Sequence, residues 1–578
     1  METPETKRWQ IYPKAPDAFV DNLRPLHPVL IQVLYNRGLV EPEAVAGILE
    51  STGALTNPFK LVGVSEAVRL IRRIVTEDGL IVIYGDYDVD GVTAVAVLVE
   101  TLRAMGARVE SYIPSREDEG YGLNPDAIRK LALDKARLLI TVDCGIRSLD
   151  EVALARKLGM RLIITDHHHV GAALPYADAV INPRQPGNPP EVHELAGVGV
   201  AFKLAQALIR TNSRVPLPTT QRELSEDDLL DLVALGTVAD MVDLLKENHT
   251  LVARGLERIN AGRRPGLSAL LREAGIRPGS VTTRTISFAL APRLNAAGRI
   301  DEAMIALNLL LAPDMAAAVP LAQELDKLNE KRREIASAVR ETAYEIVMAE
   351  GKLPPLIFAA SETFPAGVVG LAANRLLDEF YRPAVVVSVE AEYSKGSARS
   401  IPEFHITEAL DRLDGLLVRH GGHAAAAGFT VVTSRLEELH ARLLELAAEA
   451  VGDRILVPTL AVDAEVPLGE LSWELYEALE RLQPFGFGNQ VPVLVSRCVK
   501  VLNARAVGGE GRHLKLYVAD RSGKSWDAIA FRQGHWAGRV PGWIDVAYLL
   551  EKNEWNERTT LQLNVQDLHP AGETEDWR

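Results

Sequence analysis

Five short apolar runs between residues 80 and 182 constrain the fold of this 578-residue chain more than any other feature. Each run is long enough for one buried strand, and amphipathic segments of helical periodicity separate the runs. Strands that alternate with helices in this way form a mostly parallel sheet. We therefore predict a doubly wound α/β domain with strands LIVIY (80–84), RVESYI (108–113), LLITV (138–142), RLIIT (161–165) and DAVIN (178–182).

The pattern changes several times along the chain, which is too long for one domain. The longest helical pattern carries apolar side chains at a regular spacing, which predicts one long helix joining two bodies. Near the C-terminus, short strands and turns indicate a small β-barrel. We predict an N-terminal helical segment (1–50), the first α/β domain (51–250), an Arg-rich connection (251–313), the linking helix (314–351), a second α/β domain (352–453) and the barrel domain (454–578).

Composition narrows the possible compartments. The two cysteines, Cys144 and Cys498, do not make a disulfide framework, which suits a reducing compartment. The polar, Pro-broken N-terminus is unlike a signal peptide, and no apolar run is long and charge-free enough to span a bilayer. We expect a cytoplasmic protein without membrane contact.

The charge of the Arg-rich connection is opposite to that of the whole chain. The formal net charge is −15, which alone argues weakly against binding nucleic acid, but residues 251–300 contain nine arginines and only Glu257 and Glu273 as acids. Arginine forms bidentate contacts to phosphate, so this segment predicts an anion-binding surface. A solvated face or an interdomain contact is the alternative.

The stretch YGDYDVDG (84–91) places Asp86, Asp88 and Asp90 directly after the first strand. It begins like a calcium loop, but the twelfth position is Val97 where a bidentate glutamate is required. An apolar helix follows. An acidic loop between a strand and a helix occupies the usual position of a binding site in an open α/β sheet.

Further acids and histidines follow the other strands. Asp143 follows the run 138–142, DHHH (166–169) follows 161–165, and Asp240 ends a later apolar segment. Because the ends of parallel strands share one edge of the sheet, we expect these side chains to converge on a metal site, although each alone could be a helix cap or a satisfied histidine. Many carboxylates with one or two imidazoles suit two bridged ions, manganese or magnesium, of the kind that hydrolyses phosphate esters.

These motifs resemble a known superfamily. YGDYDVDG, TVDCG (141–145), TDHHH (165–169) and GTVADMV (236–242) resemble the four motifs of the DHH phosphoesterases, and RHGGHAAAAGF (419–429) resembles the signature of the DHH-associated domain. APRLNAAGRI (291–300) and QPFGFGNQVPVL (483–494) are similar to segments of the bacterial branch that degrades single strands in the 5′→3′ direction.

The resemblance implies a metal-dependent exonuclease that hydrolyses single-stranded DNA from its 5′ end to mononucleotides, in DNA repair and recombination. It implies two divalent cations, Mn2+ or Mg2+, as cofactors. The implied partners are single-stranded DNA, a single-strand-binding protein and a helicase, and a monomer is expected. The alternative is a DHH-family phosphodiesterase for short oligonucleotides or cyclic dinucleotides, but such proteins usually lack the linking helix and the barrel.

The superfamily's site residues carry over position by position. His168 corresponds to the residue that assists at the scissile phosphate, and Asp86 is a second catalytic candidate, which bonds either to a ligand or to a bound water. Tyr84 stands where many members have a ligating histidine, which suggests that a water fills that position. The implied metal ligands are Asp88, Asp90, Asp143 (the bridge), His167 and Asp240.

The implied substrate contacts come from both α/β domains. Arg399, with Ser397 and Arg116, is assigned to the terminal phosphate. Phe364 and Pro365 stand where this branch usually has Trp-His. The barrel resembles an OB-fold, a general binder of single strands. The full set of implied phosphate contacts is Arg116, Arg293, Asn295, Arg299, Ser397, Arg399, Ser400, Gly422 and His423.

Overall fold

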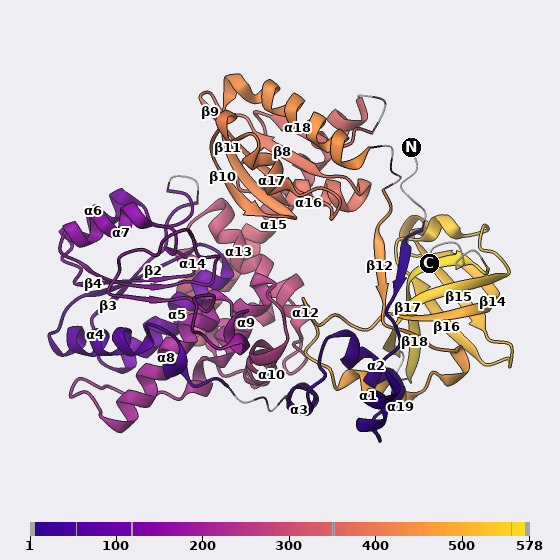
Figure 1. Ribbon diagram of the computed structural model, residues 1–578, viewed down its shortest axis with the longest axis horizontal. Coiled ribbons are helices and arrows are strands. Elements are labelled where there is room, and N and C mark those ends of the chain that lie inside the picture. Colours follow the sequence, from indigo (N-terminus) through magenta and orange to yellow (C-terminus); the bar gives the residue numbers. More distant parts are fainter. Residues whose placement is uncertain are drawn as a thin grey trace.

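Three bodies make up the molecule, which is described by a computed structural model (Figure 1). The first α/β body and the second are joined by one long helix, and a β-barrel body lies beside them. The structure describes residues 6–51, 53, 55–116, 119–349, 351, 353–452, 454, 456–555 and 558–572.

The first body contains a five-stranded sheet in the order β3-β2-β4-β5-β6, in which every neighbouring pair is parallel. Side chains of the strands alternate between two buried layers: Ile83 packs with α4, α5 and α8, whereas Val82 packs with α6 and α7. Helices therefore cover both faces, as the alternating pattern predicts. The elements are α4 (Val64–Thr76), β2 (Ile81–Gly85), α5 (Val89–Ala104), β3 (Val109–Tyr112), α6 (Pro125–Leu133), β4 (Leu138–Val142), α7 (Leu149–Lys157), β5 (Arg161–Thr165), β6 (Ala179–Ile181), α8 (Gly197–Arg214), α9 (Leu230–Asp240) and α10 (Lys246–Asn260).

The Arg-rich connection is helical and belongs to the same core. Leu270, Leu294 and Leu309 are buried in the hydrophobic cluster that also contains the strands of the first sheet. The connection consists of α11 (Pro265–Glu273), α12 (Thr283–Thr285), a π-helical turn (Ile286–Leu290), α13 (Ala291–Ile300) and α14 (Met304–Leu310).

A single helix, α15 (Met315–Ala349), joins the two α/β bodies. Leu325 is buried in the core of the first body, whereas Val339 and Val347 are buried in the core of the second. The apolar stripe of α15 is thus a packing seam that changes partner halfway along the helix. This arrangement confirms the predicted linking helix.

The second body has a mixed sheet in the order β10-β11-β9-β8-β7, in which only β7 and β8 are parallel. The two faces of β8 pack into different cores, because Val385 lies with α17 and α18 and Val386 lies with α15 and α16. The elements are β7 (Ile357–Ser361), α16 (Val369–Phe380), β8 (Ala384–Ser388), β9 (Tyr393–Arg399), α17 (Ile406–Asp411), β10 (Leu417–His423), β11 (Ala426–Val432) and α18 (Leu436–Val451).

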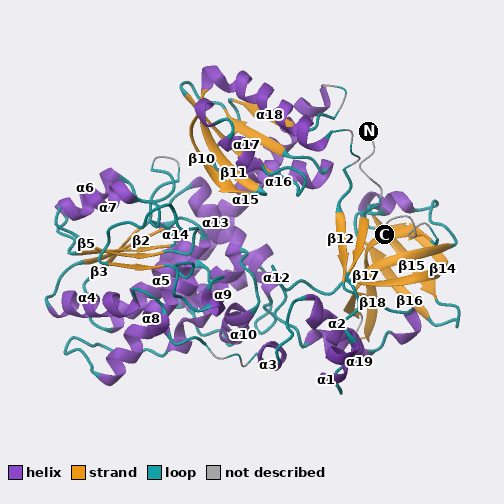
Figure 2. Cartoon of the chain, viewed as in Figure 1, coloured by secondary structure: helices purple, strands orange, loops and turns teal. Residues whose placement is uncertain are grey.

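The third body is a closed barrel. Its strands follow the order β14-β15-β16-β18-β17, and β14 also pairs with β17, which closes the ring. Figure 2 shows these strands as one curved sheet. The predicted OB-like barrel is therefore confirmed. The elements are β12 (Thr459–Val462), β13 (Ala464–Glu465), α19 (Trp473–Glu480), β14 (Leu494–Val507), β15 (His513–Ala519), β16 (Ser525–Ala530), β17 (Trp543–Trp555) and β18 (Arg558–Pro570).

The N-terminal segment differs from the purely helical prediction. It contains a strand, β1, that pairs in parallel with β12, because Trp9 is buried against Val462 and Val495 of the barrel body. A strand of only four residues is too short to be recognised from the periodicity of its sequence. The helices that follow pack on the barrel through side chains such as Leu30 and Leu34. The elements are β1 (Arg8–Ile11), α1 (Asp17–Asn22), α2 (Pro28–Asn36) and α3 (Pro42–Glu50). Among the helices that the structure describes, none has both the length and the apolar character needed to cross a membrane.

Candidate active site

The acidic loop turns tightly between β2 and α5. Asp88 is the N-cap of α5, and its Oδ1 accepts a hydrogen bond of 3.0 Å from the backbone N–H of Gly91. A Cβ on Gly91 would lie 2.5 Å from the carbonyl oxygen of Asp86, so only glycine fits this turn. The turn places Asp86, 5% exposed, and Asp90, 1% exposed, at the edge of the sheet.

The N-terminus of α8 points at Asp90. The carboxylate of Asp90 accepts hydrogen bonds from the backbone N–H groups of Gly197 (2.6 Å) and Val198 (2.8 Å). The positive end of a helix stabilises a buried negative charge. Gly197 also approaches the bridge candidate, because a Cβ at this position would lie 2.7 Å from Oδ1 of Asp143.

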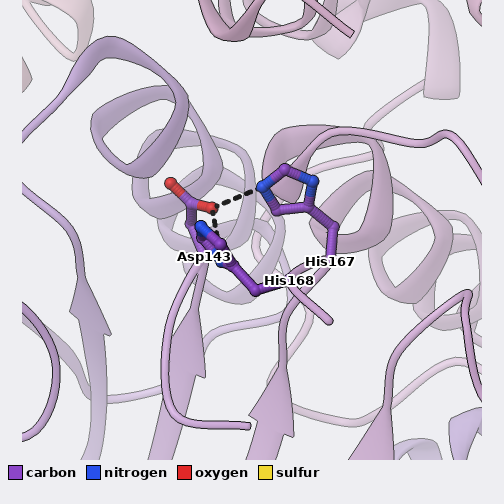
Figure 3. A group of neighbouring side chains, drawn as sticks. All are labelled: Asp143, His167 and His168. Atoms are coloured by element: carbon purple, nitrogen blue, oxygen red, sulfur yellow. Dashed lines mark ion pairs between the residues drawn. The ribbon is translucent and has the colours of Figure 1, made fainter. Parts of the chain in front are cut away.

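The side chains at the ends of the strands converge as predicted. His167 Nε2 lies 3.2 Å from Asp143 Oδ1, 3.7 Å from Asp240 Oδ2 and 3.9 Å from Asp90 Oδ2. Figure 3 shows one carboxylate oxygen of Asp143 joined by dashed lines to the rings of both His167 and His168. We call the acids at this edge the carboxylate cluster, which consists of Asp86, Asp88, Asp90, Asp143 and Asp240.

Three groups of ligand atoms at this edge lie close enough together to hold a metal ion, and one of them consists of Asp143, His167 and His168. Of the other two groups, Asp86, Asp88 and Asp143 form one, and Asp90, His167 and Asp240 form the other, each with its ligand atoms within 4.8 Å of one another. Asp143 contacts both groups, because its Oδ1 is also the nearest carboxylate oxygen to His167. This is the position that a bridging carboxylate requires.

Unpaired acceptor atoms show that the cluster fits cations. Four buried atoms have no hydrogen-bond partner within the described structure: Oδ1 of Asp86, Oδ1 of Asp143, Nε2 of His167 and Oδ2 of Asp240. All four are electron-pair donors of the kind that manganese and magnesium accept. Burial, followed by the nearby charge of Asp88, raises the pKa of Asp86 to about 8, and burial with carboxylate repulsion raises the pKa values of Asp90 and Asp143 well above their usual range. Divalent cations would remove both the repulsion and the unpaired acceptors.

Asp166 holds the catalytic candidate His168 in place. Its Oδ1 lies 2.8 Å from Nδ1 of His168 and accepts the backbone N–H groups of His167 and His168, while Oδ2 accepts the N–H of Ile146. Burial alone would raise the pKa of Asp166, but these hydrogen bonds lower it below its usual value. The hydroxyl of Tyr121 lies 3.1 Å from the same nitrogen. From the sequence, Asp166 is part of the DHHH motif but receives no role. No sequence pattern predicts that the hydroxyl of Tyr121 lies close to His168.

Tyr84 points away from the cluster. It is fully buried, its hydroxyl donates a hydrogen bond of 3.0 Å to the carbonyl of Gly122, and its ring stacks on Tyr112. Tyr84 therefore belongs to the hydrophobic cluster on the face of the sheet that α6 and α7 cover. Tyr84 is thus not directed at the carboxylate cluster, and the expectation of a water there stays a prediction.

A second group of charges, all positive, lies beside the acids. Arg116 stacks on Tyr87 and donates a hydrogen bond of 3.1 Å from Nε to the carbonyl of Gly298. Arg299 donates from Nη1 to the carbonyl of Gly367 at 3.1 Å. Burial, followed by the guanidinium groups of Arg116, Arg332 and Arg399, lowers the pKa of Arg299 to about 9, and Asp88 opposes this shift. We call Arg116, Arg299 and Arg399 the guanidinium cluster.

Other implied substrate residues are not brought into this cluster. Arg293 pairs with Asp326 on α15 at 2.7 Å, and the buried hydroxyl of Ser400 donates to the carbonyl of Phe404 at 2.5 Å. Oδ1 of Asn295 accepts the N–H of Val89 at 3.2 Å and so holds the start of α5. In this structure these three side chains make internal contacts.

The second body faces the histidines of the first. His423, at the end of β10, is exposed, and its ring centroid lies 6.0 Å from that of His169. Gly422 precedes it at φ +152°, where a Cβ would lie 2.2 Å from the carbonyl oxygen of Ala426. Phe364, by contrast, is 2% exposed in the core of the second body, and its neighbour Pro365 is exposed.

Part of the positive charge of the Arg-rich connection is compensated by acids from elsewhere in the chain. Arg258 pairs with Asp228, and Arg264 pairs with both Asp231 and Glu100. Arg299 is the arginine of this segment that belongs to the guanidinium cluster. A window of sequence could not reveal these pairs, because their acids lie up to 164 residues away.

Comparisons with known proteins agree with this geometry. The DHH family N-terminal domain matches residues 80–237, the DHHA1 domain matches 354–449 and the RecJ OB domain matches 462–567. The fold and the carboxylate cluster thus define a DHH phosphoesterase with a DHHA1 domain and an OB domain.

Individual relatives narrow this class. The chain is 38% identical to the single-stranded-DNA-specific exonuclease RecJ of Bacillus subtilis, over 97% of this chain and 70% of that protein. The crystal structure of RecJ from Thermus thermophilus in complex with Mn2+ superposes with a TM-score of 0.83 at 31% identity, covering 98% of this chain and 80% of that one. The complex of that protein with Mg2+ gives 0.76 at 29% identity, with 97% and 78% covered. The chain belongs to the RecJ family.

Proposed function

We propose that this chain is a metal-dependent exonuclease that hydrolyses single-stranded DNA from its 5′ end to mononucleotides. The observation that carries the proposal is the position of the guanidinium cluster beside the carboxylate cluster: Arg116 stacks on Tyr87, the residue between Asp86 and Asp88. Two adjacent sites of opposite charge suit a substrate end with two phosphates, one free and one at the cleaved bond. The relatives described as single-stranded-DNA-specific exonucleases support the same substrate.

The carboxylate cluster is the proposed site of hydrolysis. Asp88, Asp90, Asp143, His167 and Asp240 would hold two divalent cations, which neutralise charge on the phosphate and make water more acidic. His168 is half-exposed and has its Nδ1 bound to Asp166, so its Nε2 is available to contact the scissile phosphate. Asp86 is the second proposed catalytic side chain, and its unpaired Oδ1 also makes it a candidate ligand.

The guanidinium cluster is the proposed site of the terminal phosphate. Arg399 lies on β9 next to Ser397, to whose hydroxyl its Nη1 donates at 3.1 Å. Guanidinium groups present paired N–H donors that match a phosphate dianion. Arg293, Asn295, Ser400, Gly422 and His423 stay predicted substrate contacts. The ring centroid of His423 lies 6.0 Å from that of His169.

The barrel supports a polymeric substrate over a short one. Its surface exposes the aromatic rings of Tyr517, Phe531 and Trp543, each more than 40% exposed. Exposed aromatic rings stack on unpaired bases irrespective of sequence. A phosphodiesterase for short oligonucleotides or cyclic dinucleotides would have no use for this surface.

We also propose the cellular setting that the sequence indicates. Both cysteines are free, which agrees with a reducing compartment and hence with the cytoplasm. Action in DNA repair and recombination, a single-strand-binding protein and a helicase as partners, and a monomeric state belong to the same proposal.

Digestion of labelled strands tests the proposed function. The substrates are a single strand with a 5′-phosphate, its 5′-hydroxyl twin, a blunt duplex, a closed circular single strand and an RNA of the same sequence, each with manganese or magnesium. We expect mononucleotides from the linear DNA strands, fastest with the 5′-phosphate, and resistance of the duplex. Cutting of the circle at the rate of the linear strand would instead indicate an endonuclease.

Arg399→Ala should narrow the advantage of the 5′-phosphorylated strand. Arg435 provides a matched control, because it is an arginine of the same body that pairs with Glu438 on the surface. If Arg399→Ala kept the full advantage while remaining folded, the terminal phosphate would bind elsewhere.

A further inference from the structure

Residues 329–332 of α15 lie where this helix leaves one core and enters the next. Leu328 packs against the core of the first body, and Ile335 packs against the core of the second. Between them, Asn329 is only 4% exposed. This short stretch therefore lies at the junction of the two α/β bodies.

Two polar atoms in this stretch lack partners. Within the described structure, neither Oδ1 of Asn329 nor Nε of Arg332 has a hydrogen-bond partner, although both atoms are buried. Buried polar groups are nearly always hydrogen-bonded, so an unpaired one indicates a ligand or a water. A guanidinium N–H can only donate, and the ligand of Arg332 must therefore be an acceptor.

The packing of α13 places Arg332 beside the guanidinium cluster. The ion pair between Arg293 and Asp326 joins α13 to α15, and six residues further along each helix stand Arg299 and Arg332. Arg299 in turn contacts the second body, because it donates to the carbonyl of Gly367. Arg332 is thus near the point where α13, α15 and the second body meet.

Positive charge gathers in this region and suits an anion. Arg116, Arg299, Arg332 and Arg399 are all half-buried, and no ion pair joins any of them to an acid among the described residues. Burial, followed by the like charges of Arg333 and Arg375, lowers the pKa of Arg332. Like charges this close together repel one another, and a bound anion would offset this repulsion.

We propose that Arg332 is a phosphate-positioning residue, so that the linking helix itself completes the guanidinium cluster. The ligand is the terminal phosphate of a single strand, and this inference rests on the proposed function. The four arginines then come from the first body, the connection, the linking helix and the second body. One bound phosphate contacts all four parts and fixes the strand end relative to the carboxylate cluster.

Kinetics with paired substrates test this role. The variants are Arg332→Ala, Arg332→Lys and, as a matched control, Arg333→Ala, which removes the same charge from an exposed neighbour. Each is assayed on 5′-phosphorylated and 5′-hydroxyl single strands with manganese. We expect Arg332→Ala to raise KM for the phosphorylated strand about tenfold, the loss typical of one charge-assisted hydrogen bond. Its kcat and its KM for the hydroxyl strand should change by less than about twofold, as should both constants of Arg333→Ala.

The outcomes separate this inference from the proposed function. Arg332→Lys should recover part of the lost affinity, because it restores the charge without the planar fork of donors. A folded Arg332→Ala protein that favours the phosphorylated strand as strongly as the wild type would overturn the inference alone. A wild-type protein that degraded neither strand would overturn the proposed function. If Arg332→Ala melts at a much lower temperature than the wild type, the test rests on Arg332→Lys. A KM of this variant for the phosphorylated strand equal to that of the wild type would also contradict the inference.

Discussion

The carboxylate cluster and the guanidinium cluster are opposite in charge but share one property. Each gathers like charges that form few ion pairs within the described part of the chain, so each suits a ligand of opposite sign. They differ in burial: Asp86, Asp90 and Asp143 are at most 5% exposed, although Asp88 and Asp240 are half-buried, whereas all the arginines are half-buried. Buried acids suit ions that stay bound through many cycles, and a more open arginine site suits a strand end that must enter and leave at each cycle.

The largest expected effect follows from the bridge. Asp143→Asn should abolish hydrolysis, because it removes the carboxylate that contacts both groups of ligand atoms. In metal-free buffer the same change should raise the melting temperature, since it relieves repulsion between buried carboxylates. Asp150→Asn, at an exposed position in the first turn of α7, provides the control for both measurements. Activity above a few per cent of wild type with manganese would contradict the bridging role.

Metal binding should stabilise the acidic region strongly. A ligand at a hundred times its dissociation constant adds about 2.7 kcal/mol of stability. Manganese titrated into chelator-treated protein should therefore raise the melting temperature of the wild type progressively. For Asp240→Asn the rise should be smaller, and for the guanidinium-cluster variant Arg399→Ala it should equal that of the wild type. Equal shifts for all three proteins would place the metal elsewhere.

Salt dependence should distinguish two arginines of one helix. Each phosphate contact to a single strand contributes about 0.7 to the slope of log affinity against log salt. Arg299→Ala should flatten the slope by this amount, because Arg299 lies in the guanidinium cluster. Arg293→Ala should flatten the slope less and should also lower the melting temperature, because Arg293 pairs with Asp326. The reverse result would exchange the roles assigned to the two residues.

The smallest expected effect concerns Tyr84. Tyr84→Phe should cost about 1 kcal/mol of stability, the worth of its hydrogen bond to the carbonyl of Gly122. Activity with manganese should stay close to that of the wild type, because the hydroxyl points away from the carboxylate cluster. A large loss of activity with unchanged stability would show that this hydroxyl reaches the metal site after all.

The sequence predicts the carboxylate cluster far better than the guanidinium cluster. Asp88, Asp143 and His167 follow the ends of neighbouring strands, and the parallel sheet brings such ends together regardless of other details. The central strands β2, β4 and β5 also carry strong apolar signals. These features depend on local sequence and on one simple topology.

The guanidinium cluster depends on contacts that no local pattern contains. Arg299 and Arg399 come from different bodies and meet only because α15 sets the distance between them. The charge of a sequence window also leaves out distant partners, since the acids paired with Arg258, Arg264 and Arg293 lie outside the window. Arg332 belongs to a highly charged helix, and no sequence feature distinguishes it from the exposed charged residues beside it.

Counting the bound ions tests the central claim most directly. Calorimetric titration of metal-free protein with manganese should give two ions per chain for the wild type. Asp143→Ala should bind fewer, since the bridge between the two groups of ligand atoms is lost. Arg399→Ala, which changes only the guanidinium cluster, should still bind two. A wild-type stoichiometry of one, or two ions bound unchanged by Asp143→Ala, would contradict the account.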